Sequence, residues 1–254
     1  MQGESKQRRM EPNERREEIL DAAQALFTEN GWEAVTVADV LEAAGISRGG
    51  FYHHFTAKDD LLAGIVTRMT RQGLAAAEMA RRKVSGNALA KLNAFLTGSV
   101  RWKADNVEEM RFFADVLTKP GNDILYRRVF DATAAAVLHV LEGMIAEGVA
   151  DTTFDVADAR LTAELIVALS HGRRQVLDDA TTLAALDIDK ATGQLDARMR
   201  AEGATCDRLL GLPPGSVALP NPCDYRRMLV GLVTTVTSPH QAPRTNGPVP
   251  QEKP

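Results

Sequence analysis

Seven of the side chains between residues 36 and 58 that carry a hydroxyl, imidazole or cationic group are candidates for a binding site. They are Thr36, Ser47, Arg48, Tyr52, His53, His54 and Lys58. Hydroxyl and cationic groups bind phosphate oxygens, and the guanidinium of arginine also pairs with guanine through two hydrogen bonds. We therefore predict that Arg48 reads a base, with a phosphate contact as a nearly equal alternative. Thr36 and Ser47 are predicted to offer hydroxyl hydrogens to phosphate as well as to cap helices.

Lys58 is expected in the first turn of a helix, where a positive charge opposes the helix dipole. A lysine at this position makes sense if a phosphate lies opposite, and the free N–H groups of a helix start also attract phosphate. His54 has two interpretations, a contact with nucleic acid or a packing residue with one ring nitrogen satisfied. A basic arm is formed by Lys6, Arg8 and Arg9; it lies along nucleic acid or is a solvated tail.

The elements that would position these groups begin with a helix over residues 13–30. Its apolar residues repeat at helical spacing, and the glycine of Asn30-Gly31 accepts the left-handed conformation of a helix end. Thr36 and Asp39 have the spacing of a capping box, which starts a short helix that runs through Ala44. The sequence thus predicts two helices joined by a short link.

A third helix is predicted from Ser47 to about His53 or His54, after a tight turn at Gly45. Phe51 and Phe55 are four residues apart and share its buried face. At 100° per residue, the other faces then carry Arg48, Gly49, Tyr52 and His53. Gly49 and Gly50 let the backbone approach a groove closely, or else they mark a helix of low propensity. Two short helices with a tight turn are the arrangement that places one helix in a major groove of DNA.

The remaining chain reads as further helices, so the expected fold class is all-α. A capping signal at 56–59 precedes an apolar stripe from Leu61 to Met69. The later expected helices are about 89–100, 112–117, 123–147 (closed by Gly148), 155–178, 183–211 (weakly) and 225–236. Five prolines in the last sixteen residues predict a disordered tail.

Composition and charge limit the possible classes of protein. The net charge of the chain is −4, and residues 1–58 contain seven basic and ten acidic residues, so any DNA-binding charge must be concentrated on one face. Cys206 and Cys223 have no metal-ligand spacing and suggest reduced thiols, with a disulfide between them as the less favoured alternative. No secretory signal and no run of eighteen apolar residues is visible. We expect a cytoplasmic protein without a membrane span, metal or cofactor.

The segment GISRGGFYHHFTAKDDLL, at residues 45–62, resembles the helix-turn-helix of the TetR family of regulators. The resemblance begins at about Arg15 and includes ILDAAQALFTENGW and TVADVLEAAGIS. It implies a basic arm at 1–12, a DNA-binding domain at 13–60 (helix-turn-helix 36–55), a ligand-binding and dimerisation domain at 61–237, and a tail at 238–254. The DNA-contacting residues would be Thr36, Ser47, Arg48, Gly49, Gly50, Tyr52, His53, His54 and Lys58.

The same resemblance implies that the protein is a homodimer that binds a palindromic double-stranded DNA operator and an unknown small-molecule effector. The dimer interface would use helices at about 155–178 and 223–237. Candidate effector contacts are Trp102, Phe113, Tyr126, His139, His171 and Arg174. The effector would shift the dimer toward a state whose two recognition helices are wrongly spaced, and DNA would be released.

Two other classes of function fit the sequence less well. An enzyme is not favoured, because the sequence has no Walker A loop, no G-x-G-x-x-G after a strand, no G-x-S-x-G and no H-E-x-x-H. A helical protein-interaction module, or a small-molecule-binding protein without a DNA role, would explain the C-terminal part of the chain. It would not explain the compact glycine turn with its hydroxyl caps and following lysine.

Overall fold

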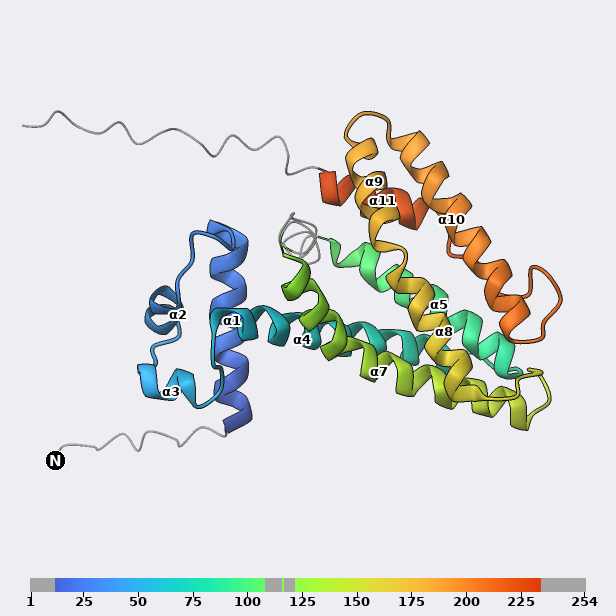
Figure 1. Cartoon of the computed structure of the whole chain (residues 1–254), viewed down its shortest axis with the longest axis horizontal. Helices are drawn as coiled ribbons and strands as arrows, with labels where there is room; N and C mark the ends of the chain where they lie inside the picture. The colour runs from blue at the N-terminus through green and yellow to red at the C-terminus, as the bar shows by residue number, and fades with distance from the viewer. Residues whose placement is uncertain (1–11, 108–115, 117–121, 234–254) are drawn as a thin grey trace, which may run out of the picture.

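The computed structural model describes residues 12–107, 116 and 122–233, and none of these residues is in a β-strand. Figure 1 shows a small N-terminal head formed by α1 (Pro12–Asn30), α2 (Val37–Ala43) and α3 (Arg48–Tyr52). The long helix α4 (Lys58–Arg82) starts beside the head and runs into a larger helical body. The predicted all-α architecture is confirmed.

The body contains the remaining helices, with labels as in Figure 1. They are α5 (Ala88–Asp105), α7 (Asp123–Ala150), α8 (Ala159–His171), α9 (Arg174–Ala184), α10 (Ile188–Leu209) and α11 (Pro222–Val233). The basic arm, the helix expected at about 112–117 (apart from Val116) and the proline-rich tail lie outside the described residues. The proposed domain boundary at residue 60 falls inside α4, so this helix serves both head and body.

Two glycine turns in the head follow the sequence prediction. Gly31 and Gly45 end α1 and α2 with φ angles of 80° and 60°. This left-handed region carries little steric cost for glycine and a real cost for residues with a Cβ atom. The turns therefore bring α2 and α3 back across α1 within a short length of chain.

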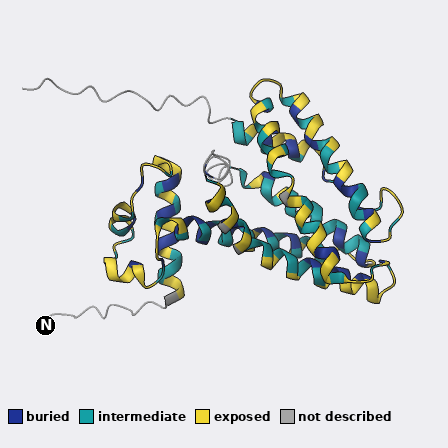
Figure 2. Cartoon of the chain, in the orientation of Figure 1, coloured by how far each residue is buried: buried dark blue, intermediate teal, exposed yellow. Residues whose placement is uncertain are grey.

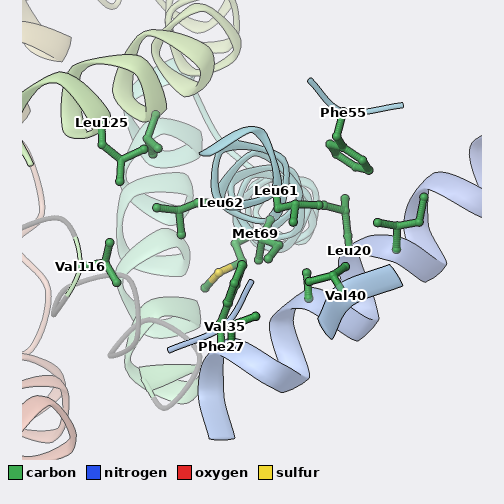
Figure 3. Close-up of a cluster of buried hydrophobic side chains, with 14 of the residues drawn as sticks. Leu20, Phe27, Val35, Val40, Phe55, Leu61, Leu62, Met69, Val116 and Leu125 are labelled. Atoms are coloured by element: carbon green, nitrogen blue, oxygen red, sulfur yellow. The ribbon is translucent and has the colours of Figure 1, made fainter. Parts of the chain in front are cut away.

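The apolar core of the head continues into the body through α4. Figure 3 shows side chains from α1, α2 and α4 meeting others from the start of α7. The fully or nearly buried members include Ile19, Leu20, Phe27, Val40, Phe51, Leu61, Leu62, Val116, Leu125 and Val129. Because burial of each large side chain stabilises the fold by about 1.5–3 kcal/mol, head and body are joined by a shared core rather than by a linker.

Two further apolar clusters stabilise the body. One lies between α4, α5, α7 and α8, with Leu92, Phe95, Leu141 and Ile145 among its buried members. The other joins α9, α10 and α11, and Val100 of α5 packs against it. The last helix contributes its apolar stripe to this second cluster, since Tyr225 and Leu229 are buried there.

One described helix, α7, is long and apolar enough to cross a membrane by length and composition. This helix contains no uninterrupted run of eighteen apolar residues, because charged residues such as Asp131 and Glu142 divide the sequence. Within the structure, Leu141, Met144 and Ile145 of α7 are buried in the body. The length and composition of α7 therefore coincide with its role as a central packing helix.

Two sequence predictions about helix boundaries need correction. The helix expected at 155–178 is two helices, because the chain turns at Gly172 and the guanidinium of Arg173 pairs with Glu202 of α10. The helix expected to close at Gly148 continues to Ala150. A side chain at Gly148 would collide with the Phe154 ring, so this glycine serves packing rather than a helix stop.

The start of α4 is also organised differently from the expected cap. The residue before the helix is Ala57, which has no capping side chain. Instead, the Asp60 carboxylate accepts hydrogen bonds from the amides of Thr56 and Ala57, at 2.8 and 3.1 Å. The hydroxyl of Thr56 donates to the same carboxylate. The predicted helix start is correct, while the capping group comes from inside the helix.

Candidate nucleic-acid interface

The cap of α2 has the reciprocal geometry that its sequence predicts. The hydroxyl oxygen of Thr36 accepts from the amide of Asp39 at 3.3 Å, and the Asp39 carboxylate accepts from the Thr36 amide at 2.7 Å. The Thr36 hydroxyl donates to that carboxylate at 2.8 Å. These hydrogen bonds from Thr36 lower the pKa of Asp39. The hydroxyl hydrogen of Thr36 is therefore already in use, and a phosphate would have to displace Asp39 to receive it.

The helix α3 is anchored by the two phenylalanines that the sequence indicated. Phe51 is fully buried, Phe55 is nearly so, and their ring centroids are 5.7 Å apart. From α1, the guanidinium of Arg16 lies 5.1 Å above the Phe55 ring. The Ser47 hydroxyl oxygen caps the helix by accepting from the amide of Gly50 at 3.2 Å. The short helix thus has one face fixed to α1 and α4.

The other faces of α3 are open to solvent. Arg48, Gly49, Gly50 and His53 are exposed, and Tyr52 is 51% exposed. Figure 2 shows this helix as a largely exposed edge of the head. A Cβ atom added at Gly49 would meet nothing within 4 Å, so the packing of the protein itself does not require glycine there. The exposed edge combines a cation, an imidazole, a phenol and bare backbone, which are groups that bind phosphates and base edges.

His54 occupies a position between this exposed edge and the core. Its ring makes an edge contact with His53, with centroids 5.0 Å apart, and it also lies near Phe55. Burial lowers the pKa of His54, and the charges of His53, Arg16 and Arg15 act in the same direction. The sequence left open whether His54 packs or binds, and its half-buried setting is compatible with both.

Lys58 is held by its own chain. Its ammonium donates a hydrogen bond to the backbone carbonyl of Trp32 and lies 4.3 Å from the centroid of the Trp32 ring. Sequence analysis did not pair Lys58 with Trp32. A signal was present in the composition of the link, because an indole face is the preferred aromatic partner of a cation.

The six candidate effector contacts do not come together in one binding site among the described residues. Tyr126 and Arg174 meet, with the guanidinium 4.0 Å from the ring centroid and 3.1 Å from Asp123. Trp102 packs against Gly73 of α4 and the shared core, and His139 is exposed on α7. Phe113 and the side chain of His171 lie outside the described residues.

Two polar groups inside the body were missed by sequence reasoning. Lys103 of α5 is partly buried, and burial together with the charge of Arg173 lowers its pKa to about 8. The Tyr225 hydroxyl is buried without a hydrogen-bond partner among the described residues. Tyr225 falls in the helix expected at 225–236, but no local pattern reveals which polar groups the tertiary packing encloses.

Surface depressions occur at two places in the described part of the body and head. One, of about 540 Å³, is lined by residues that include Arg81, Lys91, Glu147 and Asp151. The other, of about 580 Å³, lies between α1 and α4, beside Gln24 and Arg68. Neither depression includes any of the six candidate effector contacts.

The N-terminal part of the chain is similar in sequence to known proteins. Residues 19–65 match the family described as bacterial regulatory proteins, tetR family. Over 50 residues the chain is 46% identical to the HTH-type transcriptional repressor KstR2 of Mycobacterium tuberculosis, covering 20% of this chain and 25% of the relative. Over 54 residues it is 43% identical to the HTH-type transcriptional repressor AcnR of Corynebacterium glutamicum, covering 21% and 29%. The matched segment is thus little more than a quarter of these relatives.

Solved structures extend the similarity beyond the head. A protein from Syntrophomonas wolfei assigned to the TetR family of transcriptional regulators aligns with a TM-score of 0.55 and 16% identity, over 77% of this chain and 96% of that one. The fatty acid degradation regulator FadR of Bacillus halodurans aligns with a TM-score of 0.50 and 17% identity, over 74% and 95%. At these identities the similarity concerns the fold of head and body together.

Proposed function

We propose that this chain, whose residues 19–65 match the TetR family of bacterial regulatory proteins, is a DNA-binding transcriptional repressor. It regulates transcription rather than catalysing a reaction, and it acts in the cytoplasm. Repression is the proposed sign of regulation because the relatives KstR2 and AcnR carry that description.

The observation that carries this proposal is that α3 is buried on one side and exposed to solvent on the other. Phe51 and Phe55 fix one side to the core, and the opposite side presents Arg48, Gly49 and Tyr52 to solvent. A helix held in this way can enter a major groove without any change in the head. Arg48 is the proposed base-reading residue, while Ser47, Gly50, Tyr52 and His53 contact the phosphate backbone or adjacent bases.

A homodimer presents two copies of α3 to successive major grooves. The two half-sites of a palindromic operator would then lie about 34–36 Å apart, or a multiple of that distance. The proposed dimer surface includes α8, whose Leu161 and Leu165 are 53% and 44% exposed. The last helix is a weaker choice than its sequence suggested, because its buried residues already pack within the protomer.

A small-molecule effector binding in the body is proposed to control DNA release. Among the candidate contacts, Tyr126 and Arg174 have the best support, because they join α7 to the start of α9. Trp102, Phe113, His139 and His171 remain hypotheses. An effector that binds the DNA-incompetent arrangement more tightly shifts the population of dimers toward it.

Selection of bound DNA from a random pool tests the proposal. We expect an enriched sequence with two-fold symmetry, and an affinity that falls steeply as salt rises. Arg48→Ala should lose about 1–3 kcal/mol of discrimination at particular bases, whereas an equal loss on all sequences would reassign Arg48 to phosphate. Recovery of no sequence, with binding insensitive to salt, would contradict the proposed function.

A further inference from the structure

The ammonium of Lys58 is enclosed by the link between α1 and α2. Besides the hydrogen bond to the Trp32 carbonyl and the contact with the Trp32 ring, it lies 5.9 Å from the centroid of the Phe27 ring. The Trp32 and Phe27 rings pack against each other at 5.0 Å. The charged end of the side chain therefore lies against two aromatic rings and a carbonyl oxygen, all supplied by the chain segment that precedes α2.

Acidic groups near Lys58 also favour its charged form. The carboxylates of Glu33, Asp59 and Asp39 interact favourably with it, and no other cation is among its principal electrostatic partners. Burial lowers the pKa of Lys58 while these three carboxylates raise it. A phosphate would have to draw the ammonium away from a carbonyl, an indole face and three acidic groups at once.

The contact between Lys58 and Trp32 connects two parts of the head that are distant in the sequence. Lys58 is the first residue of α4, and Trp32 lies four residues before the Thr36 cap of α2. Their contact joins positions that are 26 residues apart. It holds the link between α1 and α2 against the start of the helix that connects the head to the body, and so it fixes where α2 and α3 begin.

We propose that Lys58 is a positioning residue for DNA binding, which clamps Trp32 and thereby sets the placement of α2 and α3, rather than a residue that contacts phosphate. This inference rests on the proposed DNA-binding function. It replaces the phosphate contact expected from the position of Lys58 in the first helical turn. The lysine is favourable at a helix start because the Trp32 carbonyl and ring supply the compensating negative potential.

A double-mutant cycle on operator affinity separates the two roles. Lys58→Met and Trp32→Leu should each weaken binding of the selected operator by about tenfold, since a desolvated cation–π contact is worth that much. The double variant should be at least about threefold tighter than the product of the two single losses predicts, because the two changes break one contact. Lys83→Met, an exposed lysine at the other end of α4, is the matched control and should bind normally.

A phosphate contact by Lys58 would give a different set of affinities. If Lys58 contacts phosphate, Trp32→Leu leaves affinity near the wild-type value, and Lys58→Met lowers the salt slope of binding by about 0.9. Independent, multiplicative losses would overturn the clamp as well. If Trp32→Leu proves poorly folded, Trp32→Phe serves in its place, because it keeps a ring against Phe27 and weakens the attraction for the cation.

A measurement without DNA keeps this inference distinct from the proposed function. In the NMR spectrum of the full-length protein, the Hε protons of Lys58 should be shifted upfield by the indole ring, and Trp32→Leu should abolish that shift. The control signals of Lys83 should not change. Lys58 signals at ordinary positions in the wild-type protein would exclude the clamp, even if operator binding succeeds. A protein with the shift but no DNA affinity would retain the clamp and lose the proposed function.

Discussion

At the scale of single residues, His54 links acidity to the stability of the head. Burial lowers the pKa of His54 from its ordinary value of 6.5, so the folded head binds a proton less readily than the unfolded chain. The contribution of neutral His54 to the free energy of unfolding is fully present above about pH 6.5. It is lost as the pH falls from there toward the lowered pKa of His54. We expect His54→Gln to reduce the pH dependence of the free energy of unfolding between pH 7 and 5, measured by urea denaturation.

His139 provides the control for this prediction. It is exposed on α7, so His139→Gln should leave the pH dependence of unfolding as in the wild-type protein. A pH dependence that is the same in all three proteins would mean that His54 does not oppose protonation in the folded state. The imidazole would then be freer to bind phosphate in its charged form.

At the scale of elements, the orientation of α1 on α4 depends on Arg68. Its guanidinium donates to Glu17 at 3.2 Å, to Asp21 at 2.6 Å and to Gln24 at 2.5 Å, and its side chain is only 15% exposed. Arg71, one turn further along α4, reaches Glu17 at 3.4 Å but is 60% exposed. The two arginines thus make the same kind of contact with very different solvent access.

This difference predicts unequal costs for the same substitution. Arg68→Met should lower the free energy of unfolding by about 1–3 kcal/mol, because it removes hydrogen bonds to charged groups from a mostly buried site. Arg71→Met should cost less than about 0.5 kcal/mol, as is usual for an exposed ion pair. Urea denaturation measures both, and equal midpoints for the two variants would contradict the assignment of Arg68 as the principal polar contact between α1 and α4.

At the scale of the whole molecule, head and body are coupled through a continuous core. Leu61 and Leu62 of α4 pack with Phe27 of the head and with Leu125 of the body (Figure 3). A displacement of α7 therefore reaches the head through packed side chains and without a flexible linker. This continuity provides a physical path for the proposed effector control, because packed cores transmit strain.

The proposed dimer makes a further prediction at this scale. Leu165→Glu places a charge on the exposed apolar face of α8, and burying an unpaired charge in an interface is strongly unfavourable. We expect this variant to sediment as a monomer and to lose affinity for the two-fold operator. The control is Leu186→Glu, because Leu186 is 86% exposed between α9 and α10 and should tolerate a charge.

Helical content by circular dichroism should be unchanged in both leucine variants. A dimeric Leu165→Glu protein would exclude this face of α8 from the interface. A monomeric wild-type protein would contradict the homodimer itself.

The sequence by itself determined the features that depend on near neighbours. The Thr36–Asp39 capping box, the Ser47 cap and the left-handed turns at Gly31 and Gly45 all follow from residues within a few positions of one another. The family resemblance has the same basis, because its motif is one continuous segment. Local hydrogen bonds and backbone sterics act whatever the rest of the chain does, so their residues can be read directly.

Only the tertiary structure decided which distant groups meet. Lys58 contacts Trp32, and Arg68 contacts α1. The helix expected at 155–178 is interrupted where Arg173 pairs with Glu202. The Tyr225 hydroxyl lies inside the body. The relative positions of the segments that carry these groups depend on the total apolar area that the packed helices bury. Hydrophobic burial is non-directional, so periodicity shows that a helix face is covered but not what covers it.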